Sequence, residues 1–236
     1  NQQLADQEAE RLARFMWDHR EIFQAELTSL SDAIEIATTD DGLTVFSDAA
    51  DATASVASGD SNAILRGLID EGYQGKALLL ILDQPAVEQA QAAGEGATIT
   101  LPLGGTLDPQ RFTPLELEVT VERLSDGQFV YENGTAGQGG PTAVLVCRGF
   151  HIVVTSGTVF VVGQQVYKAQ GLDPREFDLV VVKSPNGFRP YYDAITSTIV
   201  AVDVPGSTSA NLRSLPYTKC VRPIFPLDDD VTSPFE

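Results

Sequence analysis

Between residues 43 and 103 the chain alternates short apolar runs with amphipathic stretches, and this order constrains the fold more than any other feature. Apolar runs of this length, separated by glycine and proline turns, predict strands, and the stretches between them predict helices. The expected elements are a strand at 43–46, a helix at 62–71, a strand at 76–82, a helix at 85–93 and a strand at 97–103. A strand-helix-strand-helix-strand order is typical of a parallel sheet with right-handed crossovers.

The same alternation returns after residue 158, where apolar runs at 177–183 and 199–204 predict two further strands. Residues 112–155 have a different pattern, because apolar and polar side chains alternate for most of 115–124, as in a half-exposed antiparallel strand. We therefore predict an α/β fold, in which a mostly parallel sheet is flanked by helices and carries a mainly antiparallel β insert around 112–155.

The two ends of the chain differ from this middle part. Apolar residues at spacings of three and four predict a helix at 4–27, and Ser31 could cap a short second helix. The last segment predicts extended chain, because it contains Pro216, Pro223, Pro226 and Pro234. We expect a single domain over 1–236, made of a helical arm at 1–38, an α/β core at 43–103 and 158–204, the β insert and an extended tail at 205–236.

Charge and composition exclude several classes of function. Lys and Arg number 15 against 33 Asp and Glu, a net charge of -18, which repels nucleic-acid phosphates and anionic membranes. No apolar run reaches the ~18–20 residues of a membrane span. We expect neither nucleic acid nor membrane as a partner. Cys147 and Cys220 both lie beside apolar residues and no secretory signal precedes them, so we expect free thiols and a cytoplasmic location.

The first candidate site is the loop at 47–62, which follows one predicted strand and enters a helix. Loops at the carboxyl ends of parallel strands are where α/β proteins bind ligands, and a loop of about fifteen residues is uncommon unless it is functional or disordered. The polar residues that we expect to contact a ligand here are Asp48, Asp51, Ser58, Gly59, Asp60 and Asn62. A capped helix behind a Ser- and Ala-rich loop is the alternative interpretation.

A second candidate loop follows the strand at 177–183 and precedes another predicted helix. If the strands are parallel, both loops leave the same edge of the sheet, and two cations would approach the acids of the first loop. The residues of interest are Lys183, Ser184, Asn186 and Arg189. By sequence alone, a surface turn with charged residues explains this segment equally well.

Metal and nucleophile signatures are weak in this chain. His19 and His151 are its two histidines, and neither has a second histidine nearby, so a zinc site built wholly from this chain is not expected. An oxygen-only set of Asp48, Asp51 and Asp60 would suit a hard cation, but its spacing matches no calcium loop. No Gly-x-Ser-x-Gly motif is present. We therefore predict no catalytic residue and no metal ligand here.

The order of several short motifs resembles the C-terminal domain of the MlrC (microcystinase C)-like metallopeptidase family. These motifs are Phe46-Ser-Asp48-Ala-Ala-Asp51, Ser58-Gly59-Asp60-Ser-Asn62, Leu103-Gly-Gly105, Gly171-Leu-Asp-Pro174, Val181-Val-Lys183-Ser184, Phe188-Arg189, Asp203-Val-Pro-Gly206 and Pro226-Leu-Asp228. The resemblance implies a zinc-dependent peptidase or amide hydrolase whose metal ligands lie in a separate N-terminal domain. This chain would cover the metal cleft and shape the substrate pocket, and would be inactive alone.

The resemblance also implies partners and roles for the two loops. The partners would be the N-terminal metal-binding domain, a small peptide or amide substrate and possible further copies in a homo-oligomer. Asp48, Asp51, Asp60 and Asn62 would orient substrate or water, while Lys183 and Arg189 would bind a carboxylate or an oxyanion. Two other functions stay open: a non-catalytic binding module for a small anion, and a scaffold or oligomerisation domain that uses residues 112–155.

Overall fold

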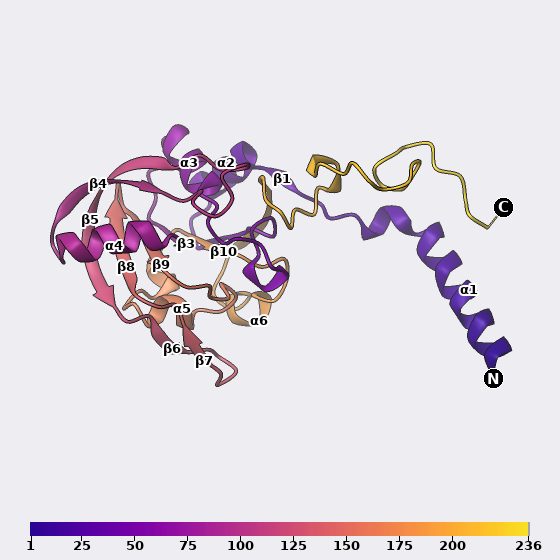
Figure 1. The fold of residues 1–236 in the computed structure, drawn as a ribbon, viewed down its shortest axis with the longest axis horizontal. Coiled ribbons are helices and arrows are strands. Elements are labelled where there is room, and N and C mark those ends of the chain that lie inside the picture. The colour runs from indigo at the N-terminus through magenta and orange to yellow at the C-terminus, as the bar shows by residue number, and fades with distance from the viewer. Residues whose placement is uncertain (236) are drawn as a thin grey trace. The chain divides into compact units, whose positions relative to one another are not determined.

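The computed structural model describes residues 1–235, and these form two compact units (Figure 1). The larger unit runs from Leu27 to Ser209. The smaller unit combines residues 1–26 with the described residues from 210 onward, and we call it the arm-and-tail unit. No helix among residues 1–235 is long and apolar enough to cross a membrane.

A nine-stranded sheet forms the centre of the larger unit (Figure 1). In spatial order its strands are β1 (Thr28–Ser29), β11 (Thr198–Asp203), β2 (Thr44–Ser47), β10 (Leu179–Val182), β3 (Ala77–Leu82), β9 (Phe150–Thr155), β8 (Thr142–Cys147), β5 (Leu115–Ser125) and β4 (Thr98–Leu103). All neighbours from β1 to β9 pair in parallel, and those from β9 to β4 pair antiparallel. The predicted α/β class with a mostly parallel sheet is therefore confirmed.

One detail of the predicted topology is wrong. The strand at 97–103 was expected in the parallel part, but β4 pairs antiparallel with β5 at the edge of the sheet. The predicted β insert around 112–155 is mainly antiparallel, since β5 pairs with β8 and β8 with β9, and these strands continue the main sheet, where β9 pairs in parallel with β3. Only β6 (Gln128–Val130) and β7 (Ala136–Gln138) form a small sheet of their own. An apolar run shows that a strand is buried, and does not show which neighbour it pairs with.

Helices cover both faces of the sheet, which explains the uninterrupted apolar run of β3. Alternate β3 residues enter two different cores, with Leu79 and Ile81 in one and Leu78 and Leu80 in the other. The first core is closed by α2 (Leu30–Thr39), α3 (Ala63–Asp70) and α4 (Gln84–Ala93), and the second by the short helices α5 (Gln165–Lys168) and α6 (Arg189–Tyr192). Strands covered on both faces are expected to be apolar throughout.

Several predicted helix limits need correction. Ser29, rather than Ser31, caps α2, because its Oγ accepts the N–H of Asp32. Helices α5 and α6 are single turns of four residues each. Four short 3-10 turns complete the helical elements: η1 (Arg20–Phe23), η2 (Thr53–Ser55), η3 (Pro174–Glu176) and η4 (Leu212–Ser214).

The arm-and-tail unit contains α1 (Gln2–Asp18), the turn η1 and a tail with little regular structure. The helix ends at Asp18, so the predicted helix at 4–27 is correct only over its first part. None of the described residues of this unit is buried, whereas the larger unit holds both cores.

Candidate functional site

The two loops predicted to carry the site leave adjacent strands. Strands β2 and β10 pair in parallel, with Phe46 opposite Val181 and Ser47 opposite Val182. The N–H of Asp48 then donates to the carbonyl of Val182, so the chains separate only after this point. The predicted parallel arrangement therefore does bring the loop at 47–62 beside the loop that begins at Lys183.

A buried ion cluster joins the two loops. The Nζ of Lys183 lies 2.6 Å from Oδ2 of Asp51 and 3.4 Å from Oδ2 of Asp48. All three residues are 2% exposed or less. Burial opposes the charged form of Lys183, but the negative charges of Asp51 and Asp48 outweigh this effect and hold its pKa above the ordinary value. Burial raises the pKa of Asp48, the more distant of the two partners.

Asp51 also folds its own loop back on itself. Its Oδ1 accepts the N–H of Gly59 at 2.8 Å and the hydroxyl of Ser58 at 3.3 Å, and its Oδ2 accepts the N–H of Ser61 at 2.9 Å. Gly59 has φ +81°, a left-handed conformation that other residues seldom adopt. One carboxylate therefore fixes both the ammonium of Lys183 and three positions of the loop.

Asp60 and Asn62 hold a third loop, which follows β4. The Oδ2 of Asp60 accepts the N–H groups of Leu107 and Asp108, at 2.6 and 3.0 Å. The amide of Asn62 donates to the carbonyls of Leu103 and Thr113. Since Asp60 and Asn62 are both buried, these contacts fix the loop backbone rather than present the side chains to solvent.

Asp83 belongs to the same buried network and was not predicted. Its carboxylate accepts the N–H of Ala86, which caps α4, and the N–H of Gly104 at 2.7 Å. Burial raises the pKa of Asp83, and the charge of Asp60 adds to that effect. An Asp directly before a helix with proline in its first turn is a recognisable cap signal, so the sequence did contain an indication of it.

The exposed part of the site is smaller than predicted. Ser184 is buried, where its Oγ accepts the N–H of Gly187 and its carbonyl accepts the hydroxyl of Ser47. Asn186 and Arg189 are exposed, and Ser58 is partly exposed. The guanidinium of Arg189 lies 3.8 Å from Asp193 and is about half exposed. The remaining predicted site residues are buried and lie beneath the loop surfaces: Asp48, Asp51, Gly59, Asp60, Asn62, Lys183 and Ser184.

These residues do not fit a metal centre. Within residues 1–235, no group of three or more His, Cys, Asp or Glu side chains is placed to hold a metal ion. The one position between two carboxylates at this edge of the sheet is taken by the ammonium of Lys183. A metal site of the usual three or four protein ligands would need a set of side chains that the described part of the chain does not bring together.

Comparison with known proteins agrees with this order of loops and strands. The family model described as the MlrC C-terminus matches residues 46–219, which include both loops. This chain belongs to the MlrC C-terminus family. The resemblance predicted from its motifs is thus confirmed.

Two relatives of this chain are much longer proteins. Microcystinase C from Sphingomonas sp is 24% identical over 184 residues, which are 78% of this chain and 36% of that protein. A crystal structure described as a "putative metallopeptidase" from Mesorhizobium sp. BNC1 is 32% identical, with a TM-score of 0.81 over 92% of this chain and 44% of the other. The chain therefore spans less than half the length of either relative.

Proposed function

We propose that this chain is the C-terminal domain of a metal-dependent peptidase or amide hydrolase, where it covers the metal cleft and shapes the substrate pocket. The observation that carries the proposal is the pair of loops joined by Lys183 at the carboxyl edge of an MlrC-type sheet. Ligands of α/β sheets bind at such an edge. The Mesorhizobium relative is described as a metallopeptidase, which supports hydrolysis of a peptide or amide bond.

The residues of the site divide into two roles under this proposal. Buried side chains, above all Asp51 and Lys183, hold the loops and act as positioning residues. Arg189, Asn186 and Ser58 are accessible and would contact the substrate. The planar guanidinium of Arg189 suits a carboxylate, such as the free end of a short peptide, because it can donate two parallel hydrogen bonds.

The metal would be held by the N-terminal part of the longer protein, since no group of side chains within residues 1–235 is placed to hold it. Zinc is the ion that we expect, and it would polarise the scissile carbonyl and activate water when bound. The identity of the ion, a cytoplasmic location and a homo-oligomeric state stay predictions.

A comparison of two arginine variants in the longer protein, with its N-terminal part present, tests the proposal. Arg189→Ala should raise the KM for a short peptide roughly tenfold, because a charge-assisted hydrogen bond is lost. Arg175 is the matched control, since it is also exposed and pairs with an aspartate, Asp173. Arg175→Ala should leave KM and kcat unchanged. An unchanged KM for Arg189→Ala, or hydrolysis by the 236-residue chain alone, would overturn the proposal.

A further inference from the structure

The arm-and-tail unit has apolar side chains but no core. None of its described residues is buried, although a helix of 17 residues and several aromatic side chains belong to it. Its exposed large apolar residues are Leu4, Leu12, Phe15, Met16, Ile22, Phe23, Tyr217, Val221 and Ile224. A chain segment with this composition usually gains its stability from a surface that covers it.

The exposed residues of α1 and η1 form one stripe. Leu12, Phe15 and Met16 follow each other at helical spacing, and each leaves about half or more of its side-chain surface exposed. Ile22 and Phe23, in the turn η1 that follows, are exposed as well. An amphipathic helix with no buried residue on its apolar face is the form that docks into, or against, an apolar partner surface.

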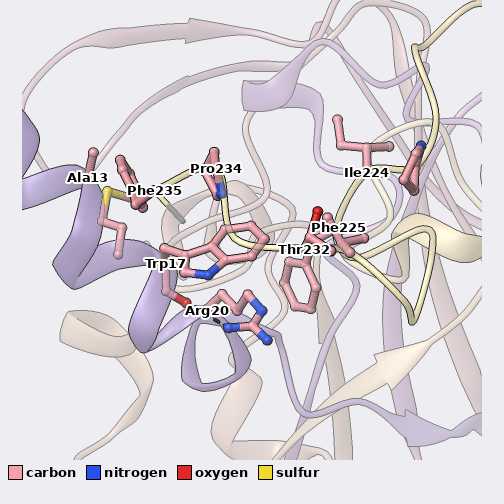
Figure 2. Close-up of a pocket in the computed structure, with 11 residues that line it drawn as sticks. Ala13, Trp17, Arg20, Ile224, Phe225, Thr232, Pro234 and Phe235 are labelled. Carbon is pink, nitrogen blue, oxygen red and sulfur yellow. Dashed lines mark hydrogen bonds between the residues drawn. The ribbon is translucent and has the colours of Figure 1, made fainter.

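A groove between α1, Arg20 and the tail adjoins this stripe, and Met16 belongs to both. Its lining includes Met16, Trp17 and Arg20 from residues 13–20 and Ile224, Phe225 and Phe235 from the tail (Figure 2). The groove has a volume of about 490 Å³. The guanidinium of Arg20 lies 4.6 Å from the ring of Trp17 and 5.5 Å from that of Phe225, so cation–π contacts hold helix and tail together.

We propose that this apolar stripe and groove dock against the N-terminal part of the longer protein, and this inference rests on the function proposed above. The family is the C-terminus of MlrC, and the relatives continue well beyond the length that this chain spans. The likeness to the Mesorhizobium structure covers 92% of the chain, more than residues 27–209 can supply, so it reaches into the arm-and-tail unit. The additional length of such relatives could supply the apolar surface that would cover this stripe.

The exposure of this surface can be measured through two residue types that occur once each in the chain. Met16 is the single methionine of this chain and Trp17 its single tryptophan. Oxidation of Met16 to the sulfoxide by hydrogen peroxide, followed by mass spectrometry of its peptide, reports exposure at the point that the stripe and the groove share. The rate would be compared between the 236-residue chain and the longer protein. We expect oxidation of Met16 to be at least about fivefold slower in the longer protein, because reactivity follows exposure.

Variants of the longer protein test whether docking of the stripe itself is what slows the oxidation of Met16. Phe15→Asp places a charge within the stripe and should restore rapid oxidation of Met16. Ile36→Asp is the control, since Ile36 is an exposed apolar residue on α2 in the other unit, and it should leave Met16 protected. Far-ultraviolet circular dichroism of each variant checks that the helices remain folded.

Two results would overturn the inference. Equal oxidation rates in the short chain and the longer protein would show that the stripe stays open. Protection in the short chain that rises with its concentration, together with a doubled mass in ultracentrifugation, would make a second copy the occupant. Peptide hydrolysis with Met16 unprotected would reject the docking surface and keep the proposed function, whereas protection without any hydrolysis would reject the function and keep the surface.

Discussion

The ammonium of Lys183 lies 2.6 Å from a carboxylate oxygen of Asp51, although 132 residues separate them along the chain. The pair joins the loop after β2 to the loop after β10, and almost no solvent reaches either group. The shape of the candidate site therefore depends on a contact that lies beneath its surface.

Removal of this cation should destabilise the larger unit strongly. Lys183→Met keeps the length of the side chain but leaves Asp51 and Asp48 buried without a counter-charge, which costs about 3–5 kcal/mol in the free energy of unfolding. Urea titration measures the effect. Lys76→Met is the control, because Lys76 is exposed, and it should change stability by less than about 0.5 kcal/mol. Equal losses in the two variants would contradict the role of the pair.

A methyl group at Gly104 should disturb the network around Asp60. Gly104 has φ +74°, and a Cβ added there would lie 2.7 Å from the carbonyl oxygen of Asp60. Gly72 has a similar φ of +70°, but a Cβ added there would have no atom within 4 Å. Gly72→Ala therefore measures only the cost of placing alanine in a left-handed backbone conformation, about 1–2 kcal/mol in the free energy of unfolding. Gly104→Ala should cost roughly 2 kcal/mol more, because backbone must move. Thermal or urea unfolding of both variants gives the comparison.

Val56 is a strained residue at the surface of the candidate site. It has φ 70°, and its side chain is 91% exposed, so no packing compensates for a backbone conformation that β-branched residues disfavour. Val56→Gly should therefore raise the free energy of unfolding by roughly 1 kcal/mol. Val130→Gly, at an exposed position in β6, should lower it by about 0.5–1 kcal/mol. A loss of stability in both variants would argue against strain at Val56.

Acid should weaken the contact that Asp40 makes with Ser197. Hydrogen bonds from the hydroxyl of Ser197, and further ones from Thr44 and the N–H of Gly42, lower the pKa of Asp40 from 3.8 to about 2. A carboxyl whose pKa is lowered on folding stabilises the protein above its unfolded pKa, and this contribution is lost as the pH falls from about 4 to about 2.

Urea midpoints measured between pH 5 and pH 2 test the contribution of Asp40. Asp40→Asn should be less stable than the natural chain at pH 5, and the difference should shrink toward pH 2. Ser197→Ala removes the principal donor, so it should move the loss of stability to higher pH. A difference that stays constant with pH would show that Asp40 does not titrate in this way.

Local patterns in the sequence predicted the elements of the fold well and their partners less well. The apolar run of β3 and the amphipathic pattern of α3 identify their types correctly, because burial on two faces or on one face leaves a direct signature. The direction of β4 could not be predicted in this way. Its pairing with β5 depends on where the chain goes after Leu103, which no local pattern records.

For the candidate site, too, the sequence predicted some features and could not predict others. Parallel strand direction predicted that the loops at 47–62 and 183–189 leave the same edge of the sheet, and the contact between Lys183 and Asp51 joins them there. Whether a charged residue faces solvent or closes an internal network depends on tertiary packing, so Arg189 and Lys183 could not be told apart in advance. Asp83 was missed because its cap signal says nothing of the loop that its second oxygen holds.

The anchoring of the long loop from below has a consequence for divergence among relatives. Asp51 secures the backbone of this loop through hydrogen bonds from Gly59 and Ser61, and Asp60 and Asn62 tie the loop to the one after β4, while residues 54–56 are exposed. Exposed side chains that do not hold the loop in place can be replaced one at a time while the fold stays the same. A common framework could thus accept new molecules by altering a few atoms at its rim.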